Sequence, residues 1–187
     1  MPRIEAETIE TARLVLEPLR IEHAGPMAIV LGDQRLHAFI GGAPDTAAEL
    51  RARYGRWLAG PSEPAESWCN WMIRLRENQQ LAGTVQATVY PSTDEDAAED
   101  AVEAEVAWMV GTAWQGQGIA TEAATALVEW LTRQPVHTVV AHIRLDHHAS
   151  AAVATAAGLA PTGEVFEGEL RWQKQSARGR GGTVEIP

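Results

Sequence analysis

The chain has 187 residues, of which 45% are hydrophobic and 21% charged, and its formal net charge is −10. These values are typical of one globular domain and exclude wholesale disorder. The sequence has no apolar run of about 18 residues that could cross a membrane, and its N-terminus, MPRIEAETIE, lacks the apolar core of a secretory signal. A single cysteine, Cys69, excludes an internal disulfide and a cysteine-built zinc site. We therefore expect a cytoplasmic protein with no membrane partner.

Acidic residues are concentrated in one stretch. Seven carboxylates lie between Asp94 and Glu105, with no Lys or Arg among them. Two interpretations stay open for this stretch: a solvated loop, or a source of negative potential that attracts a cationic substrate. Basic residues form no stripe of the kind that nucleic-acid binding requires, so we expect no nucleic-acid partner.

Strand-like and helix-like patterns alternate along the chain. In chain order the expected elements are a strand over 13–19, a helix over 22–31, a helix between Thr46 and Gly60, strands over 68–76, 81–90 and 102–110, a helix over 119–133, a strand over 136–143, a helix over 149–157, and strands over 162–166 and 169–172. Thr46 and Glu49 have the spacing of a capping box, and Asp146 is in reach of an N-cap role for the last helix. This order predicts a mixed α/β or α+β fold.

The sequence contains neither an internal repeat nor an interdomain linker. We therefore expect a single domain over residues 1–175. The Gly-rich segment 176–187 is predicted to be a flexible tail.

A glycine-containing loop at 111–118 joins the strand at 102–110 to the helix that follows. Glycine permits close backbone approach, so the loop amides and the helix N-terminus favour an anion such as pyrophosphate. A simple connecting turn has the same spacing. The nucleotide P-loop and the dinucleotide fingerprint both fit poorly, because Ile119-Ala120 replace Lys-Ser/Thr and Thr121 stands where the last glycine would be.

The loop segment Gln115-Gly116-Gln117-Gly118-Ile119-Ala120 matches the Q/R-x-x-G-x-G/A motif of the GCN5-related N-acetyltransferase (GNAT) family. Three other blocks, in family order, resemble the branch of the Rim-type ribosomal-protein N-terminal acetyltransferases: TARLVLEPL at 11–19, EVAWMV at 105–110, and ASAAV with AGL within 149–159. The resemblance extends from about residue 8 to residue 173. It has departures: His147 replaces the usual Asn, Leu159 the usual Phe, and Ala154 the Tyr that is the general acid in many members.

The resemblance implies a twisted mixed sheet, largely antiparallel and flanked by helices, in which strands 4 and 5 (102–110 and 136–143) splay apart around acetyl-CoA. It also implies transfer of an acetyl group from acetyl-CoA to a primary amine by direct attack in a ternary complex. The residues that it implies bind acetyl-CoA are Trp108, Met109, Val110, Gln115, Gly116, Gln117, Gly118, Ile119, Ala120 and His147.

Two residues are the expected catalytic groups. Glu105 begins the strand that lines the implied cleft and matches an acidic position of the Rim-type branch, so we expect it to be the general base. Glu103 shares its strand face and is the second choice. Ser150 is the expected donor near the departing sulfur. Each has a purely structural alternative, a solvated strand start for the carboxylates and a first-turn helix position for Ser150.

The partners follow from the same resemblance. The acceptor is expected to be a small-molecule amine or a protein N-terminus, and the terminal hairpin EVFEGELRW suggests a homodimer. His142, Asp146, His147 and His148 lack the spacing of a metal site, so no metal is expected. Two other functions stay open: a catalytically silent acyl-CoA-binding sensor or scaffold, and a dimerisation domain that binds no CoA.

Overall fold

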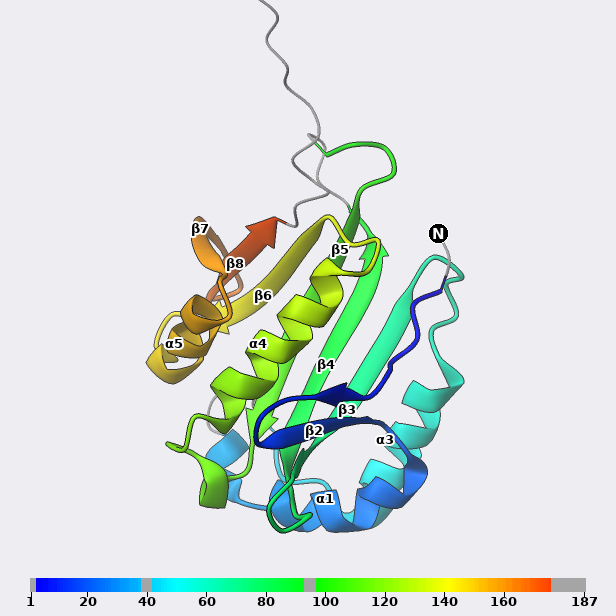
Figure 1. Cartoon of the computed structure of the whole chain (residues 1–187), viewed down its shortest axis with the longest axis vertical. Coiled ribbons are helices and arrows are strands. Elements are labelled where there is room, and N and C mark those ends of the chain that lie inside the picture. Colours follow the sequence, from blue (N-terminus) through cyan, green and yellow to red (C-terminus); the bar gives the residue numbers. More distant parts are fainter. Residues whose placement is uncertain (1–2, 38–41, 93–96, 176–187) are drawn as a thin grey trace, which may run out of the picture.

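The computed structural model describes residues 3–37, 42–92 and 97–175, whose strands form one eight-stranded sheet (Figure 1). The strand order across the sheet is β1-β2-β3-β4-β5-β6-β8-β7. The strands are β1 (Ile9–Glu10), β2 (Leu14–Pro18), β3 (Ser67–Leu75), β4 (Leu81–Pro91), β5 (Val102–Val110), β6 (Thr138–Arg144), β7 (Ala160–Phe166) and β8 (Glu169–Gln175). The helices are α1 (Ala24–Val30), α3 (Ala47–Ala59), α4 (Ile119–Thr132) and α5 (His148–Ala156). The expected mixed α/β fold is confirmed.

Each element predicted from the sequence is found near its expected place, and the strand at 102–110 has the predicted bounds. The sequence reading missed β1, whose two residues are too few for a pattern to show. The tail predicted at 176–187 and the acidic residues Asp94, Glu95 and Asp96 lie outside the described residues.

Helices cover both faces of the sheet, as the alternation in β3 requires. Trp71 belongs to the larger core cluster, and its ring lies 5.2 Å from that of Trp130 in α4 in an edge-to-face arrangement. Met72, the next residue, points the opposite way and packs with Leu50 and Tyr54 of α3. Successive residues of a strand face opposite sides, so α4 lies on one face and α3 on the other.

The only parallel pair among the described strands is β5 with β6, joined through α4. Their pairing covers just three positions, Glu103–Glu105 against Thr138–Val140. Beyond Glu105 the two strands separate, while β6 remains paired along its whole length with β8. The splaying of these two strands, implied by the sequence resemblance, is therefore confirmed.

The start of α3 is fixed by the predicted capping box. The Thr46 hydroxyl accepts from the Glu49 amide at 3.2 Å, and the Glu49 carboxylate accepts from the Thr46 amide at 2.8 Å. These two bonds satisfy backbone donors that a helix leaves unpaired at its N-terminus. The helix ends at Gly60, which has φ of +80°.

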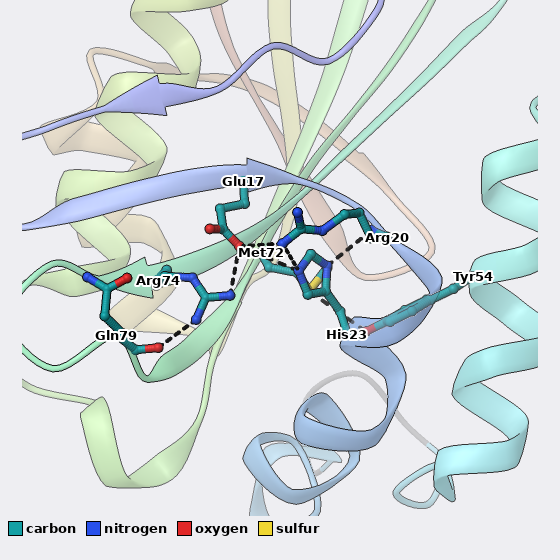
Figure 2. A network of polar contacts seen from close by, with 7 residues as sticks. All are labelled: Glu17, Arg20, His23, Tyr54, Met72, Arg74 and Gln79. Carbon is teal, nitrogen blue, oxygen red and sulfur yellow. Dashed lines mark hydrogen bonds and ion pairs between the residues drawn. The ribbon is translucent and has the colours of Figure 1, made fainter.

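A polar network anchors the turn before α1 to the sheet (Figure 2). The buried His23 ring accepts at Nδ1 from the Arg20 amide, at 3.0 Å. Glu17 of β2 accepts from Arg74 of β3 at 2.8 Å and lies 3.5 Å from His23 Nε2. Burial, followed by the charge of Arg20, lowers the pKa of His23 below its usual value. The hydrogen bond from Arg74 lowers the pKa of Glu17.

The lowered pKa of His23 predicts an acid-sensitive contribution to stability. The unfolded chain protonates this histidine near pH 6.5 and the folded chain only at lower pH, so the unfolded state binds more protons as the pH falls. His23→Asn keeps an acceptor for the Arg20 amide and removes the titration. We expect urea unfolding at pH 8 to 5 to show a free energy of unfolding that declines below pH 6.5 more steeply in the wild type than in the variant. Parallel curves would contradict the assignment.

Candidate active site

A cavity of about 850 Å³ lies beside the C-terminal half of β5, where β6 has turned away. It is bounded by β5, the loop at 111–118, the first turn of α4 and the start of α5. Most of the residues implied to bind acetyl-CoA line it, namely Trp108, Met109, Val110, Gln115, Gly116, Gly118, Ile119, Ala120 and His147. Ser150 lines it too. The structure therefore brings together predicted residues from two separate segments of the chain, 108–120 and 147–150.

Two of the predicted site residues lie outside the cavity wall. The Gln117 side chain turns back and donates to the Ala113 carbonyl at 3.1 Å. Glu105 lies at the last position of β5 that pairs with β6, between Ala104 and Val106, which both belong to the core on the α4 side. The Glu105 side chain therefore projects from the opposite face of the sheet.

The loop before α4 has the geometry of an anion site. Gly116 and Gly118 have φ of +72° and +75°, a left-handed conformation that costs glycine little. A Cβ at Gly116 would meet no atom within 4 Å, so the backbone conformation and not lack of space requires glycine there. Gly118 is the N-cap of α4 and provides no side-chain cap, so the first helical amides are left for a ligand. With the positive end of the helix dipole, this arrangement fits the pyrophosphate of CoA.

An ion pair supports this loop from the side of β2. Arg13 Nε lies 2.6 Å from Glu122 of α4, and Arg13 Nη1 donates to the Gln117 carbonyl at 3.0 Å. The Thr11 hydroxyl donates to the same carboxylate at 2.6 Å. Burial alone would raise the pKa of Glu122, but the hydrogen bonds from Thr11 and Arg13 hold it below its usual value. Arg13 thus compensates the charge of the Glu122 carboxylate in the first turn of α4.

A segment far away in sequence completes the cavity. The Thr112 hydroxyl donates to Asp33 at 2.8 Å, and Arg35 pairs with the same carboxylate at 2.6 Å. Hydrogen bonds from Arg35 and Thr112 lower the pKa of Asp33. Arg35 and Leu36 then lie on the cavity wall. No pattern in the sequence signalled this contact, because it joins residues 79 positions apart.

The start of α5 corrects one expectation. His147, not Asp146, is the N-cap: its Nδ1 accepts from the Ser150 amide at 3.2 Å. Asp146 is instead paired with Arg144 at 3.0 Å, which lowers its pKa. The imidazole of His147 thus takes the capping role that the side-chain oxygen of an Asn would have at this position, because it accepts a hydrogen bond from a backbone amide. Its Nε2 lies 3.5 Å from the Ser150 hydroxyl.

The sequence reading also missed several residues of the cavity wall, which are Arg35, Leu36, Thr112, Trp114, Thr121, Asp146, His148, Ala149, Ala152 and Val153. Thr121, Ala152 and Val153 could have been found, because each lies one helical turn or less from a predicted site residue. Ala154 occupies the position at which many family members have the Tyr that is the general acid, and it is fully buried in the core.

Within the described ranges, no three His, Cys, Asp or Glu side chains gather in a group that could hold a metal ion. The same part of the chain contains no helix that is both long and apolar enough to cross a membrane.

Comparison with known proteins identifies the family. The acetyltransferase (GNAT) domain model matches residues 13–160, most of the chain. The chain belongs to the GNAT family. No curated protein matches it in sequence.

Solved GNAT structures share the fold. An acetyltransferase from Bacillus anthracis superposes with a TM-score of 0.72 and 14% identity, over 91% of this chain and 99% of that one. RimL, a ribosomal alpha-N-protein acetyltransferase in complex with coenzyme A, gives a TM-score of 0.71 and 18% identity, over 90% and 98%. AAC(6′)-Ib, in complex with paromomycin and acetyl-CoA, gives 0.69 and 20%, over 89% and 94%. Rim-type enzymes are thus among the proteins whose fold this chain shares.

The loop geometry predicts how charge at Gly116 affects CoA binding. Gly116→Asn and Gly116→Asp have the same shape, and both residues tolerate the left-handed conformation, so they differ mainly in charge. We expect calorimetry to show weaker CoA binding by the Asp variant than by the Asn variant, by about fivefold, since one added charge near the phosphates costs roughly 1 kcal/mol. The same pair of substitutions at Gly118 would change a second contact as well as the charge, because a Cβ there would lie 3.4 Å from the Arg13 guanidinium. Equal affinities in two folded variants would remove this loop from the phosphate site.

Proposed function

We propose that this GNAT protein acetylates a primary amine, which attacks acetyl-CoA directly in a ternary complex. The observation that carries the proposal is the separation of β5 from β6 directly after Glu105. The cavity lies where the strands separate, and the Glu105 carboxylate lies on the face opposite α4. An acceptor on that face could reach a thioester held in the gap. The structural neighbours include an alpha-N-protein acetyltransferase and an aminoglycoside acetyltransferase, both of which act on amines.

The proposed step forms a bond between nitrogen and the acetyl carbon while the C–S bond breaks. The amine must first lose a proton, and afterwards the sulfur of CoA takes one. β5 is paired with β4 along its whole length, but beyond residue 105 the backbone amides that point away from β4 have no β6 partner among the described residues, so these amides can donate to the carbonyl oxygen. We propose that the Ser150 hydroxyl, on the cavity wall, donates to the departing sulfur.

We propose Glu105 as the general base. Its carboxylate is half-exposed and lies 3.1 Å from His142 Nδ1. It accepts a hydrogen bond from that nitrogen when the nitrogen carries a proton. Glu103 is less suited, because it is buried, makes two 3.1 Å contacts with Arg171 Nη2 and accepts from the Ser92 hydroxyl. Burial, followed by these two carboxylates, raises the pKa of Tyr90 to about 12, so its phenol stays protonated and cannot be the base.

The acceptor class that we propose is a small-molecule amine or a protein N-terminus, encountered in the cytoplasm. The two differ in their demand for a base. At pH 7 an α-amine is about one-tenth neutral, whereas a lysine-like amine is neutral only about one time in 2,500. A general base is therefore useful for the first and close to essential for the second.

We also propose a homodimer that forms through the terminal hairpin. β7 is the last strand of the sheet, and its Val165 and Phe166 side chains are 52% and 74% exposed. An open edge with apolar side chains is a surface that pairing with a second copy would cover.

Substitution of Glu105 provides the mechanistic prediction. Glu105→Gln keeps the shape and removes the base, so kcat/KM at pH 7 should fall by about 10²–10⁴-fold for a lysine-like amine. The loss should shrink as the pH rises toward the pKa of the amine, and it should be smaller for an α-amine. The measurement is CoA thiol release between pH 6 and 9. Unchanged rates in a variant that binds CoA normally would exclude Glu105 from the mechanism.

The same assay decides between the enzyme and the silent acyl-CoA-binding module. CoA binding without thiol release, across peptide, polyamine and aminoglycoside amines, would favour the silent module. Glu77→Gln, at the exposed turn between β3 and β4, is a matched control because it removes a carboxylate that does not line the cavity.

The dimer predicts a mass in solution near twice 20.2 kDa. Phe166→Glu should shift light scattering toward the monomer mass, because it places a charge at the proposed contact. A wild-type chain that is monomeric at high protein concentration would show the dimer prediction to be wrong.

A further inference from the structure

A second, smaller pocket lies on the face of the sheet opposite α4. It has a volume of about 80 Å³ and is lined by Trp57 of α3, by Trp68 and Asn70 of β3, and by Gln86, Ala87 and Thr88 of β4. None of these residues contributes to the acetyl-CoA cavity or to the proposed chemistry.

The register of the sheet connects this pocket to Glu105. Trp68 pairs with Thr88, and Thr88 pairs with Glu105, so the three residues form one row across β3, β4 and β5. Directly paired residues lie on the same face of a sheet. The pocket is therefore on the face where Glu105 projects, and its far wall is two strand spacings, about 10 Å, from that carboxylate.

The polar side chains of the pocket have no hydrogen-bond partner among the described residues. The residue Asn70 is only 8% exposed, and its side-chain amide makes no hydrogen bond to another described residue. The same holds, within the described ranges, for the Gln86 amide, the Thr88 hydroxyl and the indole N–H groups of Trp57 and Trp68. No side-chain nitrogen or oxygen atom that is buried among the described residues lacks a hydrogen-bond partner, so the unpaired polar atoms of this pocket are open to solvent and can bind a group that enters it.

The pocket wall also indicates the chemistry of its occupant. No Lys, Arg, Asp or Glu lines it, so neither a phosphate nor a carboxylate would find a counter-charge there. A purely apolar group would leave the Asn70 and Gln86 amides desolvated and unpaired, which is costly. Two amides that both donate and accept, beside two indole rings, suit a neutral hydrogen-bonding group.

We infer that this pocket is the acceptor subsite, and that it selects amines carrying a neutral amide or hydroxyl group about 10 Å, or two strand spacings, from the reactive nitrogen. This inference rests on the proposed function. It narrows the acceptor from any primary amine to one that extends from Glu105 across β4 to β3. The acetyl-transfer step itself is unchanged.

The test compares four linear amines of similar length. N-acetyl-1,7-diaminoheptane places an amide at the required separation; decylamine, 1,8-diaminooctane and 9-aminononanoate place an apolar, cationic or anionic group there. We expect kcat/KM for the amide probe to exceed that for each of the others by about tenfold, the effect of one good hydrogen bond. Equal values, or a preference for another probe, would overturn the inference.

Variants show whether the pocket causes the preference. Gln86→Leu, at a half-exposed position, should abolish the preference for the amide probe and leave turnover of propylamine, which is too short to reach the pocket, unchanged. Trp68→Leu is a second variant with the same expectation. Gln80→Leu, the same change at the exposed end of the β3–β4 turn, is the control and should keep the preference. A preference that survives both pocket variants would overturn the inference.

A binding measurement separates this inference from the proposed function. If no amine, including propylamine, releases CoA thiol, the proposed function fails. Calorimetry of the amide probe with CoA present still tests the pocket: weaker binding in Gln86→Leu than in Gln80→Leu would support the subsite. Absent binding, or equal binding in the two variants, would overturn it.

Discussion

The site depends on how briefly β5 and β6 pair. Parallel strands usually hydrogen-bond along their common length, but here the ladder ends at Glu105 and Val140 after three positions. β6 can leave because β8 satisfies its other edge throughout, and β5 is held in the same way by β4. Because β5 and β6 are each hydrogen-bonded to a second strand, the gap between them can stay open without unfolding of the sheet. The unpaired edge of β5 then becomes available to a ligand.

The positive end of α4 lies at the mouth of this gap, and the surrounding charges preserve it. A carboxylate in the first turn of a helix would normally compete with a bound anion. Glu122 does not, because Thr11 and Arg13 hold it on the β2 side of the loop. Arg13 also donates to the Gln117 carbonyl, so one guanidinium both neutralises the carboxylate and fixes the loop. The strand, loop and helix thus present backbone amides, and not a side-chain acid, to the cavity.

The opposite face has a different character. Glu103 is neutralised by Arg171, which leaves Glu105 beside His142 as the more accessible carboxylate in this part of the face. Next to it, on β4 and β3, lies the uncharged pocket that contains Asn70. In the function that we propose, one face of the sheet binds the anion and the other binds the amine, and the gap between the splayed strands connects them. The alternation of side chains along β5 makes this division possible.

The sequence by itself determined the elements and the family. Alternation over 102–110, the capping box at Thr46 and Glu49, and the glycines before α4 are local patterns, and local patterns report the conformation of the segment that contains them. Because nine of the ten residues implied to bind CoA lie in or next to such segments on the cavity wall, that part of the site was predictable.

Only the tertiary structure decided which distant segments meet. The contact of Asp33 with Thr112 and the row from Trp68 to Glu105 depend on strand order and register. Asp146 has a good capping side chain in sequence, but Arg144 takes its carboxylate and His147 becomes the cap. The Asp146 case is local, because Arg144 and His147 lie within two residues of it and compete for the same short segment. The other two contacts join segments far apart in the chain. They form only when strand order and register are set, so no single segment carries the information that decides them.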